Sequence, residues 1–159
     1  MRLVPDYNLK NIYEIDLEEL KSKGIKLIMF DLDSTLMVSK SGKYLPETVE
    51  WLNKVKQDFS IVVVSNNNRG KYIDNVKSIS DFDVLGSCAK PDTKVITEYI
   101  KEKGFTPKEC VIVGDRPLTD ILCGKRLGCM TILVGSINAE NEGIPTRFVR
   151  WLERLTIKG

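Results

Sequence analysis

The stretch KLIMFDLDSTL, residues 26–36, decides the fold of this chain. Its first part, Lys26–Asp31, is an apolar run that ends in an aspartate, and Asp33 and Thr35 follow at alternate positions. A run that is apolar at nearly every position predicts a strand covered on both faces, which is the usual situation in a parallel sheet. The polar residues directly after this run predict a functional site at the carboxyl end of the strand.

Four further short apolar runs resemble the first, and helical patterns separate them. The runs are Ser60–Ser65, Asp83–Gly86, Cys110–Gly114 and Cys129–Gly135. Helices are expected near residues 46–57, 69–78, 92–103 and 118–127. Alternating strands and helices are typical of βαβ units. The sequence therefore predicts an α/β fold in three layers, with five core strands in a doubly wound parallel sheet.

The length of 159 residues favours one domain over residues 1–159. We expect residues 1–25 to form an N-terminal extension and helix, with Asp16 as its N-cap, and residues 144–159 to form a basic amphipathic helix. Residues 34–45 are polar and predict a loop or small hairpin. No apolar run approaches the ~20 residues of a membrane span and no signal peptide is apparent, so we expect a cytoplasmic protein.

The absence of histidine narrows the possible chemistry. Catalysis that needs imidazole is excluded, so acid–base catalysis must come from carboxylates, lysine, tyrosine or cysteine. The four cysteines form no C-x-x-C pair and are expected to be reduced and mostly buried. The net charge of +2 is too small to indicate a nucleic-acid partner, and none is expected.

Polar residues follow four of the predicted strands, and the carboxyl ends of parallel strands meet at one edge of the sheet. These residues are Asp31, Asp33, Ser65, Asn66, Lys90, Asp115 and Asp120. Such a set suits phosphoryl transfer, because a carboxylate can attack phosphorus once a cation, a hydroxyl group and a lysine neutralise the phosphate. All-oxygen ligands favour Mg²⁺ as that cation. A second carboxylate, on the same side of an extended chain as the first, can donate a proton to the leaving oxygen.

The motifs D-x-D-x-T, Ser, Lys-Pro and G-D-x-x-x-x-D, in this order and each at a strand end, resemble the haloacid dehalogenase (HAD) superfamily of phosphohydrolases. More narrowly, the stretches FDLDSTL, SNNN, AKP and GDRPLTD are similar to the YqeG-type branch of subfamily IIIA. That branch resembles mitochondrial phosphatidylglycerophosphate phosphatases.

The resemblance implies a role for each motif residue. Asp31 would be the nucleophile that forms an aspartyl-phosphate, and Asp33 the general acid and base. Ser65, Asn66 and Lys90 would bind the phosphate.

The resemblance also implies a magnesium site. The metal ligands would be the Asp31 side chain, the Asp33 backbone carbonyl and Asp115. Asp120 would support the water shell of the metal or Lys90.

A receiver-like phospho-acceptor module is the alternative from another functional class, because it combines the same residue types on a doubly wound sheet. In a receiver the acidic pair precedes the acceptor aspartate, whereas here the D-x-D motif comes first. Asp33 also supplies a base that would hydrolyse the phosphorylated intermediate. Motif order therefore favours a phosphatase.

The substrate is predicted from the spacing between motifs. The intervals 33–65 and 65–90 leave no room for a cap domain, so we expect an open site suited to a phosphorylated substrate such as a phospholipid headgroup. The resemblance favours phosphatidylglycerophosphate, and a soluble nucleotide or phosphosugar phosphatase is the alternative. Residues 144–158 either pack on the core or contact an anionic membrane peripherally. The roles of Arg69, Lys71 and Arg116 stay open.

Overall fold

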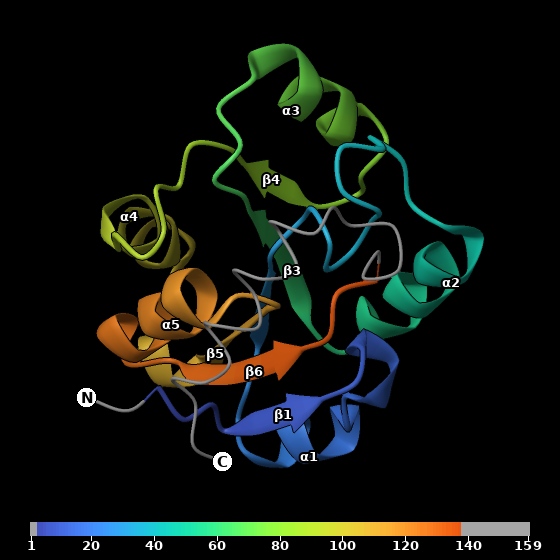
Figure 1. Ribbon diagram of the computed structural model, residues 1–159. Helices are drawn as coiled ribbons and strands as arrows, with labels where there is room; N and C mark the ends of the chain where they lie inside the picture. The colour runs from blue at the N-terminus through green and yellow to red at the C-terminus, as the bar shows by residue number, and fades with distance from the viewer. Residues whose placement is uncertain (1–2, 138–159) are drawn as a thin grey trace.

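A six-stranded parallel sheet forms the centre of the computed structural model, which describes residues 3–137 (Figure 1). The strand order is β1-β6-β5-β2-β3-β4, and every neighbouring pair is parallel. The strands are β1 (Tyr7–Leu9), β2 (Leu27–Phe30), β3 (Ser60–Val64), β4 (Asp83–Leu85), β5 (Cys110–Gly114) and β6 (Met130–Val134). The helices are α1 (Leu17–Ser22), α2 (Pro46–Val55), α3 (Gly70–Ser78), α4 (Lys94–Lys103) and α5 (Leu122–Leu127).

Both faces of the sheet are covered, because successive side chains of a strand point to opposite faces. In β2, Ile28 and Phe30 pack in a core with residues of α1, α2 and α3. Leu27 and Met29 pack in a second core with residues of α4 and α5. The predicted three-layer parallel α/β fold is therefore confirmed. The cysteines are free and buried, as expected.

The sheet has one strand more than predicted. Tyr7–Leu9 lies inside the expected N-terminal extension and pairs in parallel with β6 at the sheet edge. The Asp6 side chain accepts a hydrogen bond from the Thr131 backbone N–H at 2.8 Å. The strand could not be predicted because it has only three residues, one of them polar, and so forms no apolar run. Its pairing with β6 defines it as a strand.

The helix that follows confirms the predicted N-cap, because the Asp16 side chain accepts a hydrogen bond from the Glu19 N–H at 3.1 Å. None of the helices in residues 3–137 is long and apolar enough to cross a membrane. The predicted basic helix over 144–159 lies outside the described residues.

The central position of β2 sets the place of the site. Strand β2 lies between β5 and β3, and the chain continues from it toward β3. The chain runs the other way from β5 toward β6, so the strand order reverses between β2 and β5. Ligands of open α/β sheets bind beyond the carboxyl ends of the strands at such a point. Within residues 3–137, a loop and α2 fill the interval from β2 to β3, and α3 and β4 fill the next. Neither interval contains a cap domain, as predicted.

Candidate active site

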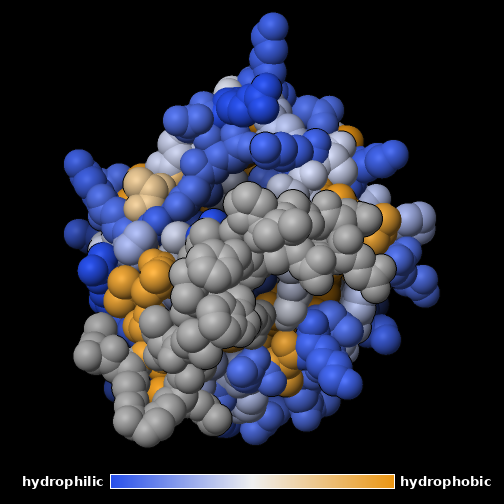
Figure 2. Space-filling view, in the orientation of Figure 1, coloured by the Kyte–Doolittle hydropathy of each residue, from blue (hydrophilic) through white to orange (hydrophobic). Residues whose placement is uncertain are grey.

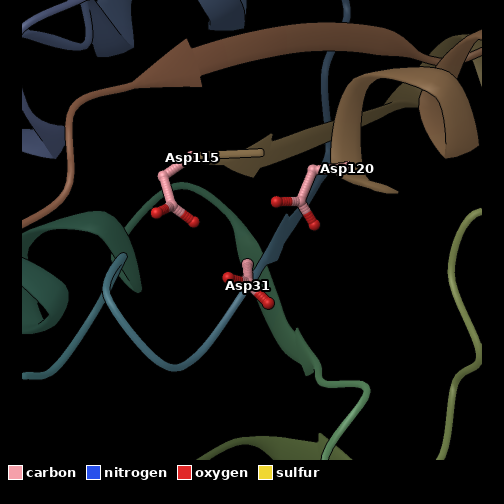
Figure 3. Close-up of side chains that lie close together, drawn as sticks. All are labelled: Asp31, Asp115 and Asp120. Atoms are coloured by element: carbon pink, nitrogen blue, oxygen red, sulfur yellow. The ribbon is translucent and has the colours of Figure 1, made fainter. Parts of the chain in front are cut away.

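Three carboxylates meet beyond the carboxyl ends of β2 and β5. Asp31 directly follows β2, Asp115 directly follows β5, and Asp120 lies in the π-helical turn Pro117–Ile121. One carboxylate oxygen from each lies within 4.8 Å of the others, and Figure 3 shows the side chains pointing toward one another. Asp115 and Asp120 are buried, whereas Asp31 is partly exposed. Asp31, the predicted nucleophile, is therefore the one carboxylate of these three that is partly exposed.

Lys90 joins two of these carboxylates. Its Nζ atom lies 2.8 Å from Asp31 Oδ1 and 2.7 Å from Asp120 Oδ1, and its side chain is 2% exposed. Burial lowers the pKa of Lys90, but the charges and hydrogen bonds of Asp120 and Asp31 outweigh it and raise the pKa above its ordinary value. The lysine therefore stays charged and fixes the Asp31 carboxylate.

Asp120 is positioned by its own turn and by Gly114. The Arg116 backbone N–H donates to Asp120 Oδ2 at 3.2 Å. A Cβ atom at Gly114 would overlap the Asp120 carboxylate, so only glycine fits there. Burial and the charge of Asp31 raise the pKa of Asp120 to about 6, although Lys90 acts in the opposite direction. The short distance between Lys90 Nζ and Asp120 Oδ1 agrees with the prediction that Asp120 supports Lys90.

Thr35 connects the two strand ends. Its hydroxyl group lies 3.4 Å from both Asp31 Oδ2 and Asp115 Oδ1. From the sequence we gave this residue no role in the chemistry, although its place in the D-x-D-x-T motif was a signal. Only the pairing of β2 with β5 brings Asp115 within reach of it.

Asp33 lies apart from the three-carboxylate cluster. Its Oδ1 atom accepts hydrogen bonds from the Tyr72 hydroxyl at 2.6 Å and from the Lys40 N–H at 2.9 Å. Burial and the bond to Asp33 raise the pKa of Tyr72, so the phenol stays a donor. No sequence signal pointed to Tyr72, because 39 residues separate it from Asp33.

Ser65 and Asn66 follow β3, beside Lys90. Ser65 Oγ accepts a hydrogen bond from the Asn67 N–H at 3.1 Å and can still donate its own hydrogen. The Asn66 side chain bonds both backbone groups of Lys90, at 2.7 Å to the N–H and 2.9 Å to the carbonyl. Asn66 thus positions the lysine, and direct phosphate binding by Asn66 remains a prediction.

The arrangement fits a divalent cation. Asp31, Asp115 and Asp120 offer converging oxygen atoms only, the donor type that Mg²⁺ prefers. The cluster is also mostly shielded from water, so charges act strongly on a group bound there. The set includes Asp120, which we expected to support the site rather than to join the carboxylate cluster.

Two solved structures illustrate the similarity of this fold to known proteins. A 2-haloacid dehalogenase from Pseudomonas syringae aligns with a TM-score of 0.59 at 15% identity, covering 80% of this chain and 99% of that chain. A HAD family enzyme from Bacteroides thetaiotaomicron, solved as a magnesium complex, aligns with a TM-score of 0.58 at 16% identity, covering 79% and 99%. These likenesses establish the haloacid dehalogenase fold.

Sequence relatives define the family within this class. The family model described as mitochondrial PGP phosphatase matches residues 1–137. The probable phosphatase YqeG of Bacillus subtilis is 35% identical over 155 residues, which cover 95% of this chain and 87% of that protein. Phosphatidylglycerophosphate phosphatase 1 of Arabidopsis thaliana, chloroplastic/mitochondrial, is 32% identical over 98% of this chain, which spans 47% of that protein. The chain belongs to the mitochondrial PGP phosphatase family and is a phosphatase with the haloacid dehalogenase fold, as its motifs predicted.

Proposed function

We propose that this phosphatase is a Mg²⁺-dependent phosphomonoesterase that forms an aspartyl-phosphate on Asp31, with phosphatidylglycerophosphate as its substrate. The observation that carries the proposal is the position of Asp31. Its carboxylate is partly exposed at a strand end, and Lys90 and Thr35 contact its two oxygens. Such a carboxylate is oriented, remains accessible and can attack phosphorus in line.

The first chemical step forms a bond between an Asp31 oxygen and phosphorus, while the ester bond between phosphorus and the leaving oxygen breaks. Asp33, protonated at this stage, gives its proton to the leaving alcohol. In the second step Asp33 takes a proton from water and the water oxygen forms a bond to phosphorus. The bond between phosphorus and the Asp31 oxygen breaks, which releases inorganic phosphate and restores the Asp31 carboxylate. Tyr72 and the Lys40 N–H hold one oxygen of Asp33, which leaves its other oxygen for proton transfer.

Phosphate binding is assigned to groups around the nucleophile. The Lys90 ammonium and the Ser65 hydroxyl would contact the phosphate oxygens that carry charge in the transition state. Asn66 contributes by holding the Lys90 backbone. A bound Mg²⁺, held by Asp31, Asp115 and the Asp33 carbonyl with Asp120 in support, would neutralise further phosphate charge.

The lipid substrate is supported by the open site and by the relatives. Residues 3–137 contain no cap domain that would cover Asp31, which favours access for a bulky headgroup. The Arabidopsis relative is named a phosphatidylglycerophosphate phosphatase. Peripheral membrane contact through residues 144–158 remains a separate proposal.

The test is phosphate release from p-nitrophenyl phosphate and from phosphatidylglycerophosphate in detergent micelles, with Mg²⁺ or with EDTA. We expect many turnovers of both substrates with Mg²⁺, and a loss of at least about a thousandfold in Asp31→Asn. A single turnover would favour the receiver-like alternative. Metal-dependent turnover that persists in Asp31→Asn would overturn the nucleophile assignment.

Metal binding can be tested separately from activity, through its effect on the stability of the folded protein. With Mg²⁺ at about 100 times its Kd, binding should add roughly 2.7 kcal/mol to the stability of the folded wild type. Asp115→Asn removes one ligand and should abolish most of this gain. Equal Mg²⁺-dependent shifts in melting temperature for both proteins would place the metal elsewhere.

A further inference from the structure

A basic cavity lies beside the candidate active site. It has a volume of about 440 Å³ and is lined by Lys40, Asn67, Arg69, Gly70, Lys71 and Tyr72. It lies between the loop after β2 and the start of α3. Figure 2 shows hydrophilic side chains over α3 at the top of the view. The sequence left the roles of Arg69 and Lys71 open, and the fold places both in one cavity with Lys40.

The lining of this cavity favours an anion. Three of its six residues carry a positive charge, and none of the six is acidic. The side chains of Lys40, Arg69 and Lys71 are exposed and can move to meet a ligand. The first residue of α3, Gly70, also lines the cavity, so the positive end of the helix dipole adds to the field.

The cavity is joined to the catalytic groups by three hydrogen bonds. Tyr72, in its wall, donates to Asp33 through its hydroxyl, and Lys40 donates to the same carboxylate through its N–H. Asn67 donates through its N–H to Ser65 Oγ. The cavity therefore adjoins Asp33, which in the proposed mechanism protonates the leaving alcohol, so it lies on the side where the leaving group sits.

We propose that this cavity binds a second phosphate ester anion, carried by the leaving group of the substrate. The inference rests on the proposed function, because that function places the leaving group at Asp33. The second anion can be the phosphodiester of a phospholipid headgroup or the second phosphate of a soluble bisphosphate. In either case Arg69 and Lys71 bind it through charge-assisted hydrogen bonds, and the Arg69 guanidinium can bind two phosphate oxygens at once. The enzyme would then select its substrate by the second anion, which lies away from the phosphate ester bond that breaks.

The experiment compares three substrates that share a phosphomonoester. Phosphatidylglycerophosphate in detergent micelles carries a phosphodiester, propane-1,3-diol bisphosphate carries a second soluble phosphate, and p-nitrophenyl phosphate carries no second anion. The test variant is Arg69→Gln/Lys71→Gln, which keeps both backbone N–H groups. The matched control is Lys54→Gln/Lys101→Gln, which removes the same charge from exposed positions near the C-terminal ends of α2 and α4.

The readout is the ratio of kcat/KM for each doubly anionic substrate to kcat/KM for p-nitrophenyl phosphate. The test variant should lower this ratio by about tenfold or more, because a hydrogen bond to a charged group is lost at each position. The control should leave it unchanged. A fall with the lipid, with the bisphosphate or with both supports the proposal and identifies the source of the anion.

Equal ratios in wild type, test variant and control, for both doubly anionic substrates, would overturn the second-anion site. Failure of the proposed function looks different, since the wild type would then hydrolyse none of the substrates. In that case the second-anion site can still be tested by measuring how tightly the Asp31→Asn protein binds a doubly anionic ligand. Its Kd for propane-1,3-diol bisphosphate, measured by calorimetry, should rise about tenfold when Arg69→Gln/Lys71→Gln is added, and an unchanged Kd would also overturn the site.

Discussion

Lys90 Nζ lies 2.7 Å from Asp120 Oδ1, and both side chains are almost completely buried, at 2% and 1% exposed. Lys90 follows β4 at the edge of the sheet and Asp120 follows β5, and strands β3 and β2 lie between them. The two residues meet because the segment after β4 returns across the end of β3, where the Cys88 N–H donates to the Ser65 carbonyl. Removing two charges from water is costly, and close contact with further hydrogen bonds offsets the cost. This pair therefore connects the stability of the fold with the placement of the nucleophile, since the same ammonium group binds Asp31.

Lys90→Met should destabilise the protein by about 3–5 kcal/mol, because it leaves two carboxylates without their common ammonium partner. Asp120→Asn should cost less, since a carboxamide oxygen still accepts from Lys90. Urea unfolding of wild type, both single variants and the double variant measures the coupling. We expect the double variant to lose about 1–3 kcal/mol less than the sum of the single losses. Additive losses would show that the pair does not contribute as a unit.

Tyr72→Phe should lower kcat for p-nitrophenyl phosphate by about tenfold, because Asp33 loses one of the hydrogen bonds that orient it for proton transfer. KM should change much less, since Tyr72 does not contact the phosphate in the proposed mechanism. Tyr99→Phe is the matched control, because Tyr99 donates a similar bond to Asp83 on β4. Equal kcat values for Tyr72→Phe and wild type would exclude a positioning role.

Gly114→Ala should displace the Asp120 carboxylate, because the new methyl group would occupy its place. We expect a loss of about 1–3 kcal/mol in stability, as for other overpacked cores. Gly70→Ala is the matched control, since a methyl group at Gly70 meets no atom within 4 Å. Thermal unfolding compares the two, and a Gly114→Ala protein as stable as Gly70→Ala would contradict the close approach of Gly114 and Asp120.

Glu109→Gln should reduce the loss of stability on acidification. The ion pair with Lys26 at 2.9 Å and the hydrogen bonds from Thr106 lower the pKa of Glu109 from its ordinary value of 4.5 to about 2. A depressed carboxyl pKa stabilises the folded state above pH 4.5, and this contribution disappears as the pH falls toward 2. Denaturant unfolding between these pH values should show a steeper decline for wild type than for Glu109→Gln. Parallel declines would contradict the assignment.

The strand and motif positions could be predicted because local composition encodes them. The runs around Lys26–Asp31 and Cys110–Gly114 are apolar at almost every position, and both strands are indeed buried on both faces. Strand β1 could not be predicted in this way, since Tyr7–Leu9 becomes a strand only through its hydrogen bonds to β6. Contacts made over a long sequence separation leave no local pattern.

The sequence by itself determined the class of protein and the candidate residues for its chemistry. The order of Asp31, Ser65, Lys90 and Asp115 along the chain, each after an apolar run, placed them at one edge of a parallel sheet and resembled the motifs of this phosphatase class. Only the tertiary structure decided how these groups pair. It placed Lys90 between Asp31 and Asp120, and it brought Tyr72 to Asp33. These distances depend on strand pairing and helix packing between segments far apart in the sequence, and no local pattern specifies them.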